Sequence, residues 1–467
     1  MHSDIPTDAL TTFIRAYGLG WTITTAPAII STTFKALLVA KRTKSTGSIE
    51  KAIMQIIPQL LKASVLQNGI PLLMGLSLSG HALWTRYHKR IVFLTALISM
   101  STIRHLFPDM KTLDLTFFLL VRAIDVFAHR IYSSLAVRKR VPEWTLEYGN
   151  IVVFMLASTE ILFSWFYEPQ RLPKSYGNWI TRMSGIDTRL LEALRAIRNG
   201  TWVYGKDTGL SHLLGDYCTQ LGLPRHLGDP VTGRIACTLV HEGKPYGCEA
   251  NVLLRFYRGF AKIFPVYLSV HLFPPLFFKT SKLVRNPGQF ISHVLFASVR
   301  SSTFLATYIA IIWYSICLVR TRIGHQLLGI NQTRLDNTIA PLVGSMLCGL
   351  SLLIESKHRR GEMALYVLPR ALYSFTERIL SPYQKGRWWE HKTAAYVESV
   401  TFALSIMTVV DAVYHNRQLV RPSFRSILSW ILQIKSTSGQ STPIDTIETE
   451  NETDEEEEGL VLRKKSV

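Results

Sequence analysis

A group of possible metal ligands stands at residues 237–248, in the sequence CTLVHEGKPYGC. The ligands would be the thiols of Cys237 and Cys248 and the imidazole of His241. Zinc in proteins is bound by such side chains, and two cysteines this close could also form a disulfide. Because the spacing is not that of a known zinc finger, we expect a structural turn with reduced thiols and no cofactor. The alternatives are a disulfide and a zinc ion whose fourth ligand is Cys218, His212 or His226.

Charged residues inside apolar segments form a second group. They are Arg122, Asp125, Glu160, Arg370 and Asp411. A charge at the centre of a bilayer costs at least about 2.5 kcal/mol and is usually paired or placed along a pathway. We therefore predict buried ion pairs between helices: Arg122 with Asp125 or Glu160, and Arg370 with Asp411. The alternative is that both arginines extend to the membrane surface.

Two more basic residues, Lys62 and Arg300, stand near the beginning of apolar segments, and a serine follows each of them two residues later. A cation at such a place can contact lipid phosphates, because long basic side chains reach the interface easily. We expect a lipid contact at the interface for both residues, with substrate binding as the alternative.

These residues must be positioned by membrane helices. The chain has 467 residues, of which 48% are hydrophobic, and apolar stretches of about 20 residues predict transmembrane helices. The expected fold class is all-α, a polytopic transmembrane helical bundle with about eight to ten spans. The predicted spans cover residues 16–40, 63–83, 91–107, 112–131, 149–167, 256–278, 291–319, 337–355, 362–380 and 395–414. Basic residues flank nearly every span, so the positive-inside rule does not decide the topology.

The spans fall into two similar units. The sequence Arg122-Ala123-Ile124 with Phe127 and Arg130 returns as Arg370-Ala371-Leu372 with Phe375 and Arg378, at an offset of 248 residues. Earlier matches have an offset of 238, and later ones have offsets of 249 to 251. This order predicts a duplicated membrane unit. The two copies would be parallel with four spans each and inverted with five.

The duplication predicts four parts of the chain. Residues 1–180 form the first transmembrane unit and residues 251–435 the second. Residues 181–250 are a soluble connector, and the helical spacing of apolar residues at 186–197 predicts a helix that lies on the membrane surface or packs on the bundle. Residues 436–467 are rich in Ser, Thr and Glu, and we expect a disordered acidic tail.

Several of these segments together resemble the transmembrane protein 135 family. They are the cysteine and histidine turn, the span Arg255–Leu276, the sequence GLSLLIESKHRRGEMALYVLPRAL at 349–372 and RPSF at 421–424. The chain departs from the family in the turn, where His241 is one place nearer the first cysteine and Gly247 replaces the usual serine. The resemblance implies a polytopic protein of peroxisomes, mitochondria or lipid droplets that acts in lipid and fatty-acid metabolism and organelle dynamics. It also implies a distant relation to the inner-membrane protein translocase family.

No nucleotide-binding, zinc-protease or hydrolase motif occurs. We therefore expect a non-enzymatic organelle membrane protein. One alternative is a transporter or channel for an anionic solute, a fatty acid or an acyl thioester, between the two units. Another is a lipid-modifying enzyme that uses the cluster His105, Asp109 and His129.

The expected partners are membrane lipids, other membrane proteins or a second copy of the chain. Although the formal net charge is +19, such an excess on a membrane protein indicates contact with lipid head groups, and we expect no nucleic acid. The resemblance implies a peroxisomal or mitochondrial location. Lys464 and Lys465 fit the dilysine pattern of the endoplasmic reticulum as an alternative.

Overall fold

The computed structural model describes residues 9–24, 69–80, 88–108, 110, 112–134, 141–142, 144–278, 285–380 and 392–434. In these ranges the chain forms helices and turns without a β-strand, which confirms the expected all-α class. Lys62, Asp109, the tail 436–467, most of the predicted span 16–40 and both ends of the span 63–83 lie outside the described residues.

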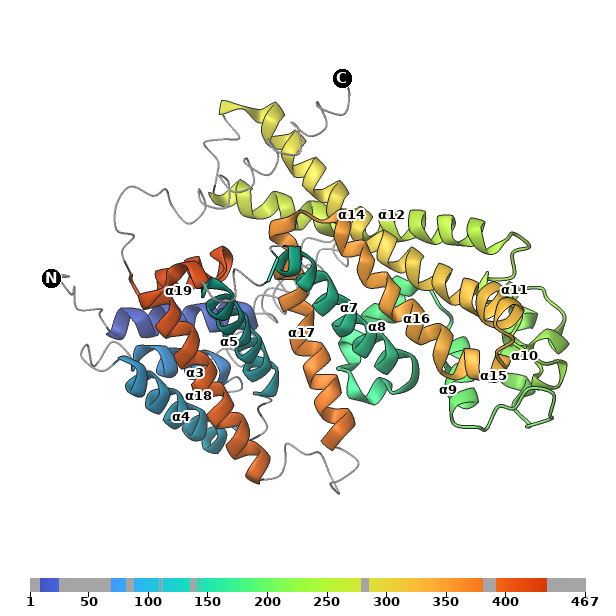
Figure 1. Ribbon diagram of the computed structural model, residues 1–467, viewed down its shortest axis with the longest axis horizontal. Coiled ribbons are helices and arrows are strands. Elements are labelled where there is room, and N and C mark those ends of the chain that lie inside the picture. The colour runs from blue at the N-terminus through green and yellow to red at the C-terminus, as the bar shows by residue number, and fades with distance from the viewer. Residues whose placement is uncertain are drawn as a thin grey trace, which may run out of the picture. The chain divides into compact units, whose positions relative to one another are not determined.

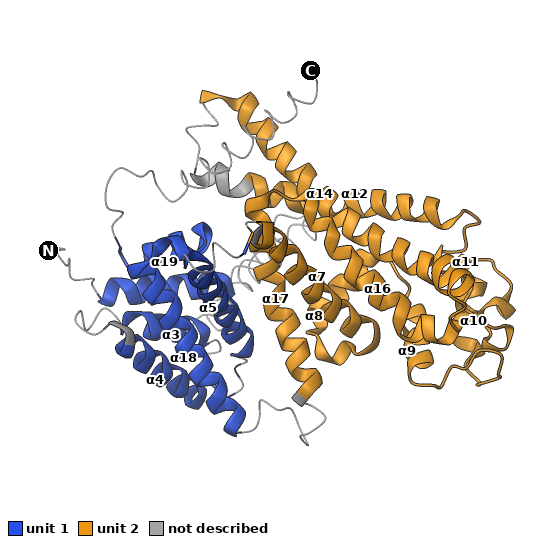
Figure 2. Ribbon diagram, in the orientation of Figure 1, with its two compact units in different colours: residues 1–141, 386–467 blue, residues 142–385 orange. Residues whose placement is uncertain are grey.

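The chain forms two compact units (Figure 2). Unit 1 combines residues 1–141 with 386–467, and unit 2 comprises residues 142–385. These units do not follow the parts expected from the duplication, because residues 149–167 belong to unit 2 and residues 395–414 to unit 1. The four predicted parts rest on similarity along the sequence and not on contacts in space, so they stay a prediction.

Unit 1 is a bundle around one long apolar helix. Its helices are residues 9–24, α3 (Gly69–Ser79), α4 (His88–Leu106), α5 (Leu113–Ser133), α18 (Lys392–His415), the 3-10 helix η9 (Arg417–Leu419) and α19 (Pro422–Ile431). Helix α18 packs against both α4 and α5 (Figure 1). Phe402, Ile406 and Val413 of α18 are buried in the core at helical spacing.

Helix α5 is apolar on two faces. Leu119, Ala123 and Val126 point into the core, whereas Phe127 and Ile131 expose 58% and 46% of their surfaces. An amphipathic helix of a water-soluble protein would be polar on its outer face. The outer face of α5 therefore suits contact with lipid.

Unit 2 is larger and contains every described residue of the expected connector. Its elements are α7 (Trp144–Tyr167), η1 (Pro169–Arg171), α8 (Lys174–Ser184), α9 (Thr188–Arg198), α10 (Ser211–Gln220), η2 (Arg225–Gly228), η3 (Pro230–Thr232), α11 (Cys237–Val240), α12 (Cys248–Phe278), α14 (Pro287–Leu318), the π-helix η4 (Val319–Leu327), α15 (Gln332–Arg334), the π-helix η5 (Leu335–Ile339), α16 (Ala340–Leu347), η6 (Cys348–Ile354) and α17 (Lys357–Leu380). Helix α7 packs against α16, η6 and α17, and α12 packs along α14 (Figure 1).

Four helices among the described residues are long and apolar enough to cross a membrane: Tyr148–Tyr167, Pro287–Leu327, Gln332–Ile354 and Thr393–His415. They coincide with the predicted spans 149–167, 291–319, 337–355 and 395–414. Helices also form at the predicted spans 112–131, 256–278 and 362–380. The larger number of spans expected from the sequence stays a prediction.

The predicted connector helix packs on the bundle. It is α9, and its residues Leu190, Leu191 and Ile197 are buried in the same core as the end of α7. Arg195 of α9 donates to the backbone carbonyls of Trp165 and Phe166, at 3.0 and 2.9 Å. These carbonyls lie in the last turn of α7, where helix backbone acceptors lack partners within the helix. The connector therefore caps a candidate membrane span.

A substitution at Gly349 tests the close contact between η6 and α7. A Cβ there would lie 2.8 Å from the Met155 Cα, whereas a Cβ on Gly149 of α7 would meet nothing within 4 Å. We predict that Gly349→Ala lowers the free energy of unfolding by about 1–3 kcal/mol through overpacking. Gly149→Ala should be neutral or stabilise the helix by up to about 1 kcal/mol. Unfolding by SDS titration in mixed micelles measures both, and equal effects would contradict the close contact.

Candidate functional site

Asp125 of α5 is held by an arginine that precedes α19. Arg421 Nε and Nη2 donate to the two carboxylate oxygens of Asp125 at 3.0 and 2.9 Å. Both side chains are mostly buried, with 16% of Arg421 and 9% of Asp125 exposed. A two-point contact of this kind is among the strongest hydrogen-bonded pairs in proteins. It attaches the beginning of α19 to α5.

Arg122, one turn before Asp125, lies between aromatic rings. Its guanidinium is 5.4 Å from the ring centre of Phe118 and 5.3 Å from that of Phe424. Phe424 is in the first turn of α19, and its ring also packs edge to face against that of Phe118, so apolar and charged contacts together join α19 to α5. The sequence predicted Asp125 or Glu160 as the partner of Arg122, and this pair stays a prediction. The structure adds Arg421 as a donor to the Asp125 carboxylate.

Glu160 and Asp411 each contact an arginine from a different predicted repeat. Glu160 of α7 accepts a hydrogen bond from Arg378 of α17 at 2.8 Å, and the Ser374 hydroxyl donates to it at 2.9 Å. Asp411 of α18 lies 3.6 Å from Arg130 of α5 and 3.0 Å from His415. Acids of the predicted fifth spans therefore pair here with arginines of the predicted fourth span of the other copy, whereas the sequence predicted Arg122 and Arg370 as partners within each copy.

The arginines of these pairs are two helical turns beyond the ones chosen from the sequence. Arg130 and Arg378 belong to the repeated motif itself, so the sequence contains a signal for them, although the predicted partners are Arg122 and Arg370. Arg370 and Asp411 belong to different compact units, and their predicted pair stays a prediction.

Arg300 lies beside a buried acid. Glu355, 1% exposed, is 3.9 Å from Arg300 and 3.5 Å from Arg359. The Arg300 guanidinium also lies 5.4 Å from the ring centre of Phe296. Its surroundings in unit 2 thus include an acid, whereas the sequence predicted a contact with lipid or substrate.

A second acid missed from the sequence is Glu398, which stands in the predicted span 395–414. It forms an ion pair with Arg104, and the hydroxyls of Thr112 and Thr116 donate to it at 2.6 and 3.2 Å. Glu398 is 7% exposed. Its position inside an apolar segment is the same signal that led to Asp411.

Unit 2 also contains a cavity of about 590 Å³. Helices α7, α8, α12, α14 and α17 contribute its walls. Buried apolar side chains form the deep part: Ile161, Leu162, Trp165, Phe304, Ile309 and Ile312. Residues at its mouth, among them Trp179 and Tyr366, are 44% and 74% exposed. The volume is within the range of small-molecule sites, roughly 300–1,000 Å³.

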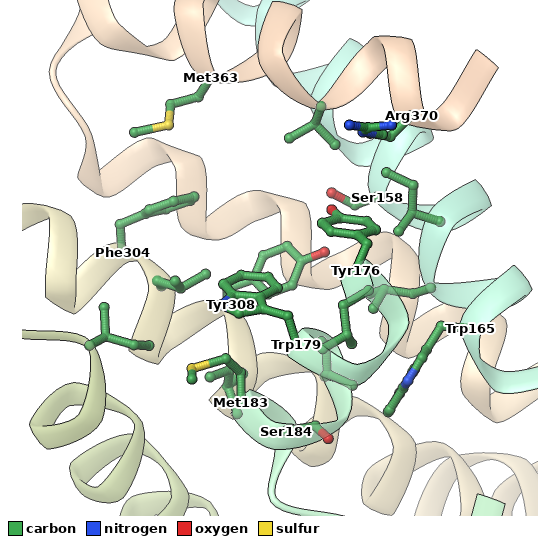
Figure 3. A pocket seen from close by; sticks show the side chains of 18 of the residues that line it. Ser158, Trp165, Tyr176, Trp179, Met183, Ser184, Phe304, Tyr308, Met363 and Arg370 are labelled. Atoms are coloured by element: carbon green, nitrogen blue, oxygen red, sulfur yellow. The ribbon is translucent and has the colours of Figure 1, made fainter. Parts of the chain in front are cut away.

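A small polar region lies at one side of this cavity. Figure 3 shows Arg370, Ser158 and Tyr176 there, whereas Phe304 and Met363 lie on another side. Burial raises the pKa of Tyr176 to about 12, so its phenol is protonated at neutral pH and can donate a hydrogen bond. Lys262 lines the cavity too and is exposed. These four polar side chains thus offer cations and hydroxyls to a ligand.

The predicted cysteine and histidine group is partly brought together. His241 and Cys248 lie with Cys317 of α14, and their ligand atoms are all within 4.8 Å of one another. Cys317 is 69 residues from Cys248 and was not predicted. Of the other candidates, Cys218 is buried in the core, whereas His212 and His226 are exposed.

No protein-family model, curated protein or solved structure matches this chain. The resemblance to the transmembrane protein 135 family therefore stays an expectation from the sequence. Fold and function must be argued from the residues described above.

The contact between Asp125 and Arg421 can be measured by a double-mutant cycle. We predict that Asp125→Asn lowers the free energy of unfolding by about 3 kcal/mol, because a mostly buried guanidinium loses its counter-charge. Combined with Arg421→Gln, the cycle should give a coupling energy above about 1 kcal/mol.

The control for this cycle is the pair Asp216 and Arg225, whose side chains are 61% and 66% exposed. Its coupling energy should be below about 1 kcal/mol, because solvent screens exposed ion pairs. Coupling energies of equal size for both pairs would contradict a structural role for Asp125 and Arg421.

Proposed function

We propose that this chain is a non-enzymatic integral membrane protein that binds the acyl chain of an anionic lipid, such as a fatty acid or an acyl thioester, in the cavity of unit 2. The observation that carries this proposal is an apolar cavity of about 590 Å³ with an arginine in its wall. The resemblance noted in the sequence favours a peroxisomal or mitochondrial membrane. Transport of the same class of molecule, the alternative expected from the sequence, stays a prediction.

The deep part of the cavity suits a hydrocarbon chain. Its wall is formed by side chains of α7 and α14 that are at most 6% exposed, such as Leu162, Phe304 and Ile309. Each methylene group that leaves water contributes about 0.8 kcal/mol. Burial of several methylene groups would therefore be enough to bind an acyl chain, and no catalytic side chain is needed.

The polar side suits a carboxylate or another anion. The planar guanidinium of Arg370 can donate two parallel hydrogen bonds to a carboxylate. The protonated phenol of Tyr176 is a further donor. An anionic head group could thus accept hydrogen bonds on this side of the cavity, whereas a hydrocarbon chain has no acceptor for them. This combination favours an amphiphile over a neutral hydrocarbon.

A cavity-filling substitution tests this proposal. We predict that Ile309→Trp weakens binding of a fluorescent fatty acid to the purified full chain by tenfold or more, about 1.4 kcal/mol. The matched control is Leu253→Trp on α12, where the side chain is 70% exposed, and binding should be unchanged. Equal binding by both variants, with unchanged elution from size exclusion, would exclude this cavity.

Arg370→Gln separates the polar contribution. It should weaken the binding of a fatty acid but leave that of its methyl ester unchanged, because the ester carries no charge. If both ligands lost affinity equally, Arg370 would be a packing residue only.

We also infer that the two units arose from one duplicated segment and exchanged their last helices. Two pairs of equivalent positions are similarly exposed: Ala123 and Ala371 are 8% and 5% exposed, and Ile131 and Ile379 are 46% and 45% exposed. In unit 1, α5 of the first copy packs against α18 of the second. In unit 2, α17 of the second copy packs against α7 of the first.

A similar contact between an arginine and a backbone carbonyl occurs in each compact unit. Arg15 in the first helix of unit 1 donates to the Trp430 carbonyl of α19 at 2.6 Å. Arg255 in α12 donates to the Ser184 carbonyl at the end of α8 at 2.7 Å. Pro173 and Trp179 at α8 match Pro422 and Trp430 at α19, at offsets of 249 and 251 residues. The contact therefore also crosses between the predicted copies.

Expression of fragments tests the exchange. We predict that residues 142–385 form a monodisperse, protease-resistant helical protein in detergent, because every helix of unit 2 is present. Residues 1–180 should not, since α5 lacks α18 and Asp125 lacks Arg421. The opposite result, with 1–180 folded and 142–385 unstable, would contradict the exchange and favour two sequential repeats.

A further inference from the structure

His241, Cys248 and Cys317 converge from three separate segments of unit 2. His241 follows α11, Cys248 begins α12, and Cys317 lies in the last turn of α14. Their ligand atoms lie within 4.8 Å of one another. Tetrahedral zinc with bonds of about 2.0–2.3 Å places its ligand atoms roughly 3.3–3.8 Å apart. Small side-chain movements would therefore bring three of the four ligand atoms of such a site to bonding distance.

The imidazole of His241 is oriented for coordination. Its Nδ1 lies 3.1 Å from the Tyr246 carbonyl oxygen, and since a carbonyl only accepts, Nδ1 carries the proton. The lone pair is then on Nε2, which is buried and has no hydrogen-bond partner among the described residues. His241 as a whole is 4% exposed. Metal-binding histidines commonly donate their other ring nitrogen to a carbonyl in this way.

The turn that carries His241 is fixed by two arginines. Arg255 donates to the Val240 carbonyl at 2.9 Å, and Arg258 donates to the Glu242 carboxylate at 2.8 Å. Glu242 has a φ of +57°, an uncommon backbone conformation for a residue with a side chain. Such strain is held only where the surroundings determine it, and it concentrates at binding sites. The turn is therefore held in place before any ligand binds.

The charge balance around the two thiols is compatible with a bound cation. Two arginines of this region, Arg255 and Arg320, are buried. Arg255 donates to two backbone carbonyls. Arg320 forms a two-point ion pair with Asp336, so the positive charge of Arg320 is already balanced. Two thiolates at Cys248 and Cys317 would add negative charge that a divalent cation balances. Thiolate and imidazole ligands select zinc over calcium or magnesium.

We propose that His241, Cys248 and Cys317 bind one zinc ion, which fixes the turn 241–248 to the end of α14. This site is separate from the cavity, and it does not depend on the proposed lipid binding. The ion would join the soluble part of unit 2 to a candidate membrane span. The sequence predicted Cys237 as the second cysteine ligand, whereas the proposed site uses Cys317.

The test uses the full chain purified in detergent under reducing conditions without added metal. We expect about one zinc ion per chain by elemental analysis. After chelation, Co²⁺ should produce the thiolate-to-cobalt charge-transfer band in the near ultraviolet. His241→Ala and Cys317→Ser should each weaken Zn²⁺ binding tenfold or more in competition with a chromophoric chelator.

The matched control is Cys218→Ser, which changes a buried thiol of the same unit outside the group. Its zinc content and cobalt spectrum should equal those of the unchanged protein. The proposal is overturned if the purified protein carries no zinc and gives no charge-transfer band. It is also overturned if alkylation and mass spectrometry find Cys248 and Cys317 joined as a disulfide in fresh membranes, or if His241→Ala binds zinc as tightly as the unchanged protein.

Discussion

A charge among apolar helices is stable only when an opposite charge or a set of donors lies against it. This constraint organises both units. In unit 1 it brings α19 onto α5, through Arg421 and Asp125, and α18 onto α5, through Asp411 and Arg130. In unit 2 it brings α17 onto α7 through Arg378 and Glu160. Apolar packing fills the space between these contacts, but it does not specify which helices are neighbours.

The hydrophobicity of the sequence predicted the positions of the long helices better than it predicted which charged residues form pairs. The spans 149–167, 291–319, 337–355 and 395–414 could be predicted because each depends on a local property, a long apolar stretch. The acids Glu160 and Asp411 could be found for the same reason. Arg130 and Arg378 stand in the repeated motif, but the sequence does not show which arginine faces which acid, because a pair depends on which helices are adjacent in space. Arg421 was missed as a partner since it lies in a short connection between helices, where a charge is unremarkable.

The cysteine and histidine group shows the same limit. Local spacing identified His241 and Cys248, but it favoured Cys237 because that residue is near in sequence. Cys317 is brought close by the packing of α12 along α14, a contact between segments that sequence distance does not reveal. Helix α14 thus carries residues for two different features. Ile309 and Ile312 line the cavity, and Cys317 follows about one turn later.

The composition of unit 1 has a consequence for synthesis at the ribosome. Helix α5 leaves the ribosome about 260 residues before α18. At roughly 5–20 residues per second, this is a delay on the order of 13–50 seconds. During that time Asp125 and Arg130 have been made, but Arg421 and Asp411 have not. Unit 2, a continuous stretch, is complete before unit 1 can close. During insertion into a membrane, the charged side chains of α5 must therefore be kept out of the bilayer centre or paired with other groups until α18 and Arg421 have been made.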